Sequence, residues 1–210
     1  MSRLRIIPIV EGFGEVQAAR TLLQRVWVEL LGGEFVDVLP PIRGKLDRLV
    51  SDKFDDLCKY VELAVGKLKA VGDDGCLGLV LVLVDAEDAA SCQLGPSLLE
   101  RAKACRPDVD LTCVVATPCF ETWFVAGAES LTEHLDLVGD VPLPSAPEQA
   151  RLGKAWIKQR IRRPKYSETV DMPRLTAAMD LKLCRERSPS FDKLCRELEA
   201  RLVTINTKDY

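Results

Sequence analysis

The sequence predicts an α/β fold, in which a parallel sheet is flanked by helices and followed by an all-helical C-terminal extension. Four largely apolar runs resemble buried strands of a parallel sheet, and the run at 76–85 is apolar on both faces. They alternate with runs whose apolar residues recur at helical spacing. Beyond Pro118 the pattern is helical, with no evident strand. This order of patterns is typical of a βαβ sheet with a helical addition.

The first part of the chain, 1–125, is expected to form one α/β domain. Its strands are predicted at 3–10, 34–41, 76–85 and 109–118. Amphipathic periodicity predicts helices between them at 14–31, 52–71 and 96–105. Phe54 lies on the expected buried stripe of the second helix.

The second part, 126–210, is expected to be a helical extension packed on the first. Helices are predicted at 119–135, 148–162, 173–185 and 190–203, with a proline-rich loop at 138–149. Ser188 or Ser190 is the expected N-cap of the last helix.

The composition is that of an ordinary globular protein. The chain has 210 residues, of which 47% are hydrophobic and 29% are charged. Its longest apolar runs are far shorter than the roughly 20 residues that cross a bilayer, and the N-terminus lacks a signal-peptide pattern. We therefore expect a cytoplasmic protein that does not associate with membranes.

The eight cysteines are scattered along the chain, and no two of them have CxxC spacing. This favours reduced core cysteines over a zinc site or a disulfide framework. His134 is the single histidine, which argues against a His-rich metal site or a Ser-His-Asp triad.

Charge is distributed unevenly along the sequence, although the formal net charge is only −3. Residues 1–150 carry 14 basic and 24 acidic side chains, whereas residues 151–187 carry 11 basic and 4 acidic ones. An acidic body with a basic segment suggests a cation site in one place and a polyanion site in another.

Acidic side chains follow two of the expected strands directly. Glu11 ends the first strand and Asp85 ends the third, with Glu87 and Asp88 within one turn. A strand order of 2-1-3-4 would make the first and third strands neighbours, about 4.8 Å apart, and bring their carboxylates together. Such carboxylates repel each other unless a hard cation relieves them, so we expect a Mg²⁺ or Mn²⁺ site.

Two other carboxylates have alternative interpretations. Glu15 is interpreted as a first-turn residue stabilised by the helix dipole, and the glycines of "GFG" as a tight passage from strand to helix. Glu121 is either a further metal ligand at the same sheet edge or another helix N-terminal acid.

The stretches "IVEGFGE" and, about 70 residues later, "LVLVDAED" resemble the Toprim fold, whose hallmark is a glutamate after the first strand and a DxD motif after the third. Glu11 and Asp85 match two of these acids, Glu87 stands at the position of the last Asp, and Asp88 could substitute for it. "CFETWFVAG", "PKYSET" and "SPSFDKL" are similar to small stand-alone Toprim-like proteins (DUF4276-like) that occur beside ATPases in bacteria.

The resemblance implies phosphoryl-transfer chemistry on nucleic acid, as in the nucleases of the overcoming-lysogenisation-defect type. Asp85 and Glu87 would hold Mg²⁺ or Mn²⁺, with Glu11 as a ligand or general base and Lys165 stabilising the transition state. The implied role is a nuclease effector that works with an ATPase partner in anti-phage or genome defence. The alternative is a non-catalytic Toprim scaffold that binds nucleic acid or the ATPase.

A basic stretch, 154–166, would supply the contacts to nucleic acid. On a helix, Lys154, Lys158 and Arg162 would share one face. We expect Lys158, Arg162 and Arg163 to contact phosphates; the alternative is an ordinary solvated helix face. The oligomeric state is left open.

Overall fold

The computed structural model describes residues 3–51, 56–72, 75–137 and 144–208. Its strands belong to one sheet and all pair in parallel: β1 (Leu4–Val10), β2 (Val36–Val38), β3 (Ile42–Arg43), β4 (Leu77–Asp85) and β5 (Asp110–Ala116). The main order is β2-β1-β4-β5, and the short β3 also pairs with β1. The expected order of the four long strands is thus confirmed, because the predicted third and fourth strands are β4 and β5.

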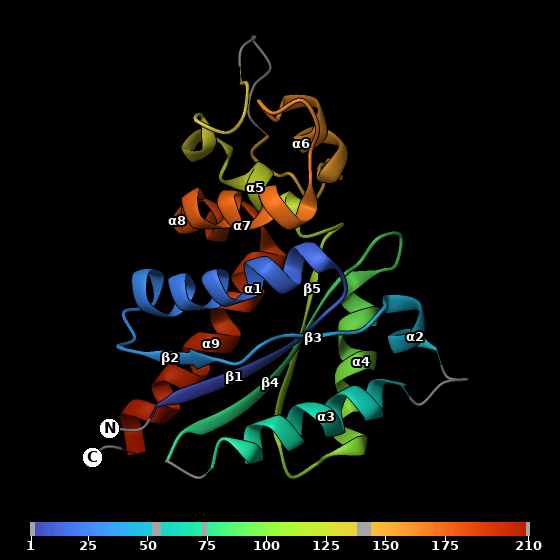
Figure 1. Ribbon diagram of the computed structural model, residues 1–210, viewed down its shortest axis with the longest axis vertical. Helices are drawn as coiled ribbons and strands as arrows, with labels where there is room; N and C mark the ends of the chain where they lie inside the picture. Colours follow the sequence, from blue (N-terminus) through green and yellow to red (C-terminus); the bar gives the residue numbers. More distant parts are fainter. Residues whose placement is uncertain (1–2, 52–55, 73–74, 138–143, 209–210) are drawn as a thin grey trace.

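Helices cover both faces of the sheet and gather beyond one end of it. They are α1 (Phe13–Arg25), α2 (Leu46–Val50), α3 (Asp56–Ala70), α4 (Ser91–Cys105), α5 (Glu121–Ala126), α6 (Lys154–Arg160), α7 (Glu168–Ala178), α8 (Leu181–Arg187) and α9 (Pro189–Lys208). Figure 1 shows α5, α6, α7 and α8 grouped above α1, whereas α3 and α4 lie on the opposite side of the sheet from α9. The predicted α/β class with a helical C-terminal extension is confirmed.

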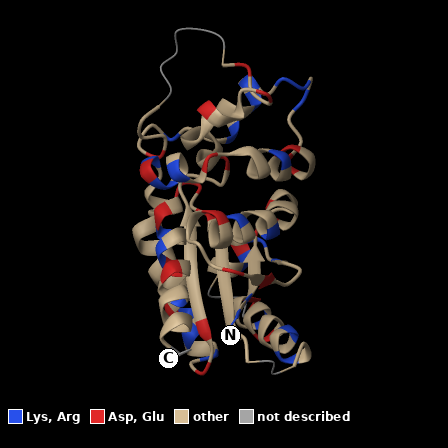
Figure 2. Cartoon of the chain, turned by 90° about the vertical axis from the view of Figure 1, so that its left-hand side faces the viewer, with Lys and Arg blue, Asp and Glu red and all other residues tan. Residues whose placement is uncertain are grey.

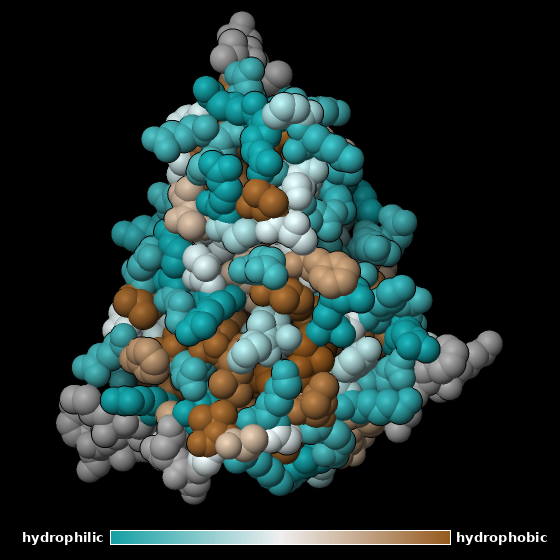
Figure 3. Space-filling model, in the orientation of Figure 1, coloured by the Kyte–Doolittle hydropathy of each residue, from teal (hydrophilic) through white to brown (hydrophobic). Residues whose placement is uncertain are grey.

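Two apolar clusters fill the space between these layers. One cluster lies between the sheet and α3 and α4. The other joins the opposite face of the sheet to α1, α5 and the C-terminal helices, with Trp123 and Phe191 in edge-to-face contact at 5.3 Å between ring centroids. The C-terminal helices therefore share a continuous core with the sheet. On the face in Figure 3, their surface is mostly hydrophilic and apolar atoms are exposed lower down.

Several expected helices are shorter than their sequence patterns. The first ends at Arg25 and continues as one π-helical turn, Val26–Leu30. The stretch predicted as one helix at 119–135 is divided at Gly127 into α5 and a 3₁₀ turn, Ala128–Leu131. Residues 52–55, including Phe54, and part of the proline-rich loop lie outside the described residues.

The cysteines are not all reduced, which corrects the expectation from their spacing. Cys58 of α3 and Cys105 of α4 form a disulfide, with Cα atoms 5.6 Å apart. The two helices lie side by side on one face of the sheet, so residues 47 positions apart in sequence meet there. The other six cysteines are not part of this disulfide.

The described helices offer no membrane span, since none of them combines the length and the apolar character that crossing a bilayer requires.

Candidate active site

Glu11 and Asp85 stand at the carboxyl ends of neighbouring parallel strands. Val10, the last residue of β1, pairs with Leu83, so Glu11 and Asp85 follow the paired segment within two residues. Asp85 Oδ1 accepts a hydrogen bond of 2.9 Å from the backbone N–H of Phe120, which precedes α5. The predicted juxtaposition at this sheet edge is therefore present in the fold.

The loop after β4 is held against the end of β5. The N–H groups of Ala86 and Glu87 donate to the carbonyls of Ala116 and Pro118, both at 2.8 Å. Glu87 has a φ of +49°, a left-handed conformation that non-glycine residues adopt infrequently and that often occurs at functional sites. Its side chain is exposed and lines the cavity described below. Asp88 points to solvent and forms an ion pair of 2.9 Å with Arg151.

Glu121 is one of the least exposed acids of the protein, at 3% of its surface. It lies in the first turn of α5, and its Oε1 accepts a hydrogen bond of 3.2 Å from the hydroxyl of Tyr166. Glu121 is thus a helix N-terminal acid, as one of its two interpretations expected, and it also lines the cavity described below.

Six acidic side chains line one cavity at this edge of the sheet, which we call the acidic cavity: Glu15, Asp85, Glu87, Asp88, Glu121 and Glu168. Its volume is about 450 Å³, and Arg151 and Lys154 are its two basic lining residues. Glu11 adjoins it, since the charge of Glu11 acts on both Asp85 and Glu15. Figure 2 shows acidic segments where the strand ends meet the upper helices.

Burial and mutual repulsion raise the pKa values of Asp85, Glu11 and Glu15. Burial raises the pKa of Asp85 well above its ordinary value of 3.8, and the charges of Glu15 and Glu121 raise it further. The pKa of Glu11 is raised by burial and then by Glu87, although the backbone N–H groups of Leu46 and Asp85 oppose this. Burial also raises the pKa of Glu15. The ionised forms of these three carboxyl groups are therefore disfavoured unless a cation is bound nearby.

Glu15, Lys154 and Glu168 belong to the cavity although the sequence patterns assigned none of them to the site. Glu168 begins α7, Lys154 begins α6, and the two side chains form an ion pair. Burial would lower the pKa of Lys154, but the hydrogen bond and charge of Glu168 and the charge of Glu121 raise it. Lys154 is therefore held as a cation among carboxylates.

Two glycines permit this close approach of distant segments. A Cβ on Gly14 of α1 would overlap the side chains of Met172 and Glu168, so α7 can approach α1 only because this side chain is absent. A Cβ on Gly153 would likewise overlap the thiol of Cys119, beside the start of α5. These contacts bring Glu168 and Lys154 to the strand ends, and no local pattern predicts them.

A family described as "Domain of unknown function (DUF4276)" matches residues 10–199 of the chain. The chain belongs to this family. The match begins just before Glu11 and includes every acidic lining residue of the acidic cavity, so the site lies within the DUF4276 domain. No curated protein and no solved structure was found to match the chain.

The acidic cavity of this DUF4276 domain has ligands suited to a hard cation, but their arrangement is open. Among the described residues, no three His, Cys, Asp or Glu side chains stand together as a ready-made metal site. The donors are carboxylate oxygens, which Mg²⁺ and Mn²⁺ prefer. Glu11 Oε2 is buried and lacks a hydrogen-bond partner, which leaves it available to a cation. The residue types thus fit such an ion.

The predicted basic residues are not gathered at this site. Lys165 is exposed and is not among the lining residues of the acidic cavity. The expected helix over 148–162 is reduced to α6, because Ile161 forms an antiparallel bridge with Leu135 instead of continuing it. Lys154, Lys158 and Arg162 therefore do not share one helix face, which corrects that expectation.

Two of the three residues expected to contact phosphates also form bonds within the fold. Arg162 Nε donates to the carbonyl of Leu135 at 3.2 Å. Arg163 forms an ion pair of 2.9 Å with Asp171, which is almost fully buried and also accepts the N–H of Ser167. Lys158 is exposed on α6 and remains the simplest candidate for a phosphate contact.

Proposed function

We propose that this protein is a Mg²⁺- or Mn²⁺-dependent phosphodiester hydrolase that acts on nucleic acid, with a catalytic domain related to Toprim nucleases. The observation that carries the proposal is the convergence of Glu11 and Asp85 at neighbouring strand ends, beside other carboxylates, with raised pKa values. Carboxylates that remain crowded in this way are stabilised by a cation.

Glu11, Asp85 and Glu87 are the residues that would hold the ion, with Glu121 deeper in the acidic cavity and Asp88 at its rim. Such an ion supplies an activated water and neutralises charge on a phosphate. Glu11 could instead accept a proton, since burial raises its pKa and its Oε2 has no hydrogen-bond partner.

Lys154 is better placed than Lys165 to act on the phosphate. Its ammonium lies among the lining residues of the acidic cavity, and its side chain is 43% exposed, so solvent and substrate can reach it. A fixed cation beside the reacting phosphate stabilises the charge that develops in the transition state. Arg151 offers a second positive charge at the rim.

The wider role rests on the resemblance described above. We propose that the nuclease is an effector that works with an ATPase partner in anti-phage or genome defence. The alternative is a non-catalytic scaffold that binds nucleic acid or the ATPase. The low exposure of Glu121 favours the catalytic proposal, because an acid buried beside other acids is costly for a scaffold and useful for binding a cation.

The test is cleavage of plasmid DNA, single-stranded DNA and RNA by the purified protein with Mg²⁺, Mn²⁺ or EDTA. We expect metal-dependent cleavage that Asp85→Asn abolishes. Asp108→Asn is the matched control. Asp108 is exposed and precedes the N-terminal end of β5, whereas the acidic cavity lies at the carboxyl ends of the strands. If no substrate is cleaved with either metal, and neither metal raises the unfolding temperature, the catalytic proposal fails and the scaffold alternative is favoured.

A further inference from the structure

A second cavity, of about 480 Å³, lies between α4 and α9 over the outer strand β5, and we call it the edge cavity. Its apolar walls come from Pro96 and Leu99 of α4, Val115 of β5 and Pro189 of α9. This volume is within the range of roughly 300–1,000 Å³ that small organic groups occupy in proteins.

Polar groups are concentrated at one part of the edge cavity. Ser190 Oγ accepts the indole N–H of Trp123 at 2.9 Å and donates to Glu148 Oε1 at 2.7 Å. Glu148 also accepts the backbone N–H of Ser190, so this lining is held in place by α9. Lys193 and Arg196 of α9 add exposed cationic side chains, which form ion pairs with Glu197 and Asp192. The cavity therefore combines apolar walls, hydrogen-bonding groups and positive charge.

The edge cavity and the acidic cavity are neighbours, because the same chain segments line both. Three short segments, 88–91, 117–118 and 148–151, connect the two cavities. In each segment, the residue at one end lines the acidic cavity and the residue at the other end lines the edge cavity. Three residues span at most about 10 Å. A ligand anchored by its phosphate in the acidic cavity can thus reach the edge cavity with the next part of its structure.

We propose that the edge cavity binds an unpaired nucleobase next to the phosphate held in the acidic cavity. The inference rests on the proposed function and names its substrate more closely, as single-stranded nucleic acid or a strand with a base out of the stack. A nucleobase has apolar faces and hydrogen-bonding edges, which match the walls and the Ser190–Glu148 lining. A base in a duplex would first have to leave the stack.

Three thiols allow each cavity to be observed separately. Cys92 is exposed and lines the edge cavity, whereas Cys119 lines the acidic cavity. Cys76 precedes β4 at the other edge of the sheet and serves as an internal control. The alkylation rate of each thiol is compared only with the rate of the same thiol without the probe. Different thiols are not compared, because burial raises the pKa of Cys119 to about 11 and slows its reaction.

The experiment measures alkylation rates of these thiols by mass spectrometry, without reductant and with Mg²⁺ or Mn²⁺. The probes are short phosphorothioate DNA and RNA oligonucleotides. Each is used in three forms: an intact single strand, a duplex, and a single strand without bases. At a concentration ten times its dissociation constant, the intact single strand should slow the alkylation of Cys92 and Cys119 about tenfold and leave the alkylation rate of Cys76 unchanged. The abasic strand should protect Cys119 alone, and the duplex should leave Cys92 reactive.

Other outcomes separate the two proposals. Protection of Cys119 without Cys92 by the intact strand would overturn the base site and leave the proposed nuclease standing. Equal protection of Cys92 by intact and abasic strands, or by the duplex, would also overturn it. If neither thiol is protected while the parent protein cleaves nucleic acid, the base site alone is wrong. If neither is protected and nothing is cleaved, both proposals fail.

A variant that fills the edge cavity gives an independent measurement. Gly95 lies in α4 and lines the cavity, and leucine has a higher helix propensity than glycine, so Gly95→Leu should preserve the helix. A Cβ at this position would lie 3.3 Å from Cγ2 of Val115, so the Val115 side chain must shift by a few tenths of an ångström, and the unfolding temperature of the variant is measured first. We expect Gly95→Leu to raise KM for the intact single strand severalfold with kcat little changed, and to leave KM for the abasic strand unaffected. An equal effect on both strands would contradict the base site.

Discussion

Asp85 and Phe120 are joined by a hydrogen bond of 2.9 Å from the backbone N–H of Phe120 to Asp85 Oδ1. The bond connects the end of β4 to the start of α5 and fixes the direction of the carboxyl group. An asparagine at this position retains an oxygen that can accept the same hydrogen bond. The charge of Asp85 can therefore be removed without removing this support.

Asp85→Asn should abolish metal-dependent cleavage and make the metal-free protein more stable at neutral pH. The folded-state pKa of Asp85 lies well above its ordinary value of 3.8, so the folded protein retains a proton that the unfolded chain releases. Between these two pKa values the stability of the parent therefore falls as pH rises, by about 1.4 kcal/mol for each pH unit. Urea unfolding from pH 4 to pH 8 measures this. An unchanged pH profile for the variant would contradict the assignment.

Lys154→Ala should reduce cleavage far more than Lys165→Ala. Lys154 lies in the acidic cavity, whereas Lys165 is exposed outside it. Loss of a positioned cation typically lowers kcat about 10²–10³-fold, and we expect a change of less than about threefold for Lys165→Ala. Single-turnover cleavage with saturating metal measures the difference. Equal losses of cleavage rate, or a larger loss for Lys165→Ala, would instead favour Lys165 as the residue that stabilises the transition state.

Arg163→Ala should destabilise the protein, whereas Lys158→Ala should leave its stability nearly unchanged. Arg163 neutralises the buried Asp171, so its loss should lower the free energy of unfolding by about 1–3 kcal/mol. Lys158 is exposed, and its loss should change stability by less than about 0.5 kcal/mol. If Lys158 contacts a phosphate, its loss should also flatten the salt slope of binding by about one unit. Urea unfolding and filter binding across a salt series distinguish them, and the reverse pattern would contradict the structure.

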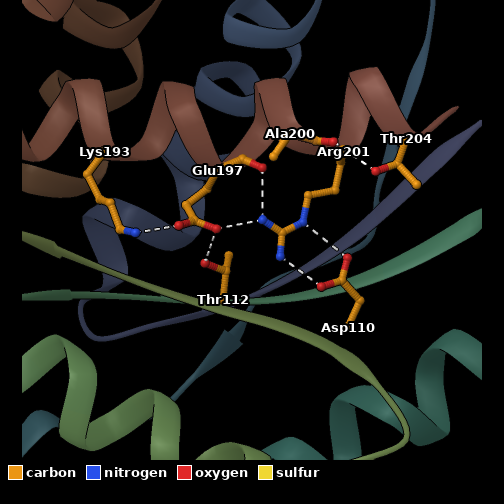
Figure 4. A network of polar contacts seen from close by, with 7 residues as sticks. All are labelled: Asp110, Thr112, Lys193, Glu197, Ala200, Arg201 and Thr204. Atoms are coloured by element: carbon orange, nitrogen blue, oxygen red, sulfur yellow. Dashed lines mark hydrogen bonds and ion pairs between the residues drawn. The ribbon is translucent and has the colours of Figure 1, made fainter. Parts of the chain in front are cut away.

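Glu197→Gln should destabilise the protein at neutral pH and have little effect in strong acid. Burial alone would raise the pKa of Glu197, but hydrogen bonds from Lys193, Thr112 and Arg201 lower it to about 2 (Figure 4). The stabilisation by this carboxylate is thus fully present above its ordinary pKa of 4.5 and is lost as pH falls through about 2.

We expect a loss of about 1–3 kcal/mol at pH 7 for Glu197→Gln, because the hydrogen bonds involve a charged group. Glu199→Gln is a suitable control, since Glu199 lies two residues away on α9 and is about half exposed. Thermal unfolding at pH 7 and pH 2.5 tests the sign. A loss that is larger at pH 2.5 than at pH 7 would refute it.

Local sequence patterns predicted four of the five strands that the structure describes, all but the short β3, and the assumed order 2-1-3-4 then brought Glu11 and Asp85 together. Long apolar, β-branched runs alternating with amphipathic helices are typical of a parallel sheet covered on both faces, and the carboxyl ends of parallel strands meet at the same end of the sheet. The same patterns predicted the helices that became α3 and α9, although the predicted ends of other helices differ from the observed ones. Helix ends depend on contacts such as the Ile161–Leu135 bridge, which local periodicity does not contain.

Packing between distant segments determines which other residues join the site. Glu15 was interpreted as a helix-dipole residue, and Lys154 and Glu168 lie more than 130 positions from Glu11 in the sequence. They reach the strand ends because α7 packs closely on α1 at Gly14 and Gly153 approaches Cys119. The Cys58–Cys105 disulfide has the same origin, in the packing of α3 beside α4. Such contacts depend on the shapes of two distant surfaces, and the sequence of either surface alone does not reveal its partner.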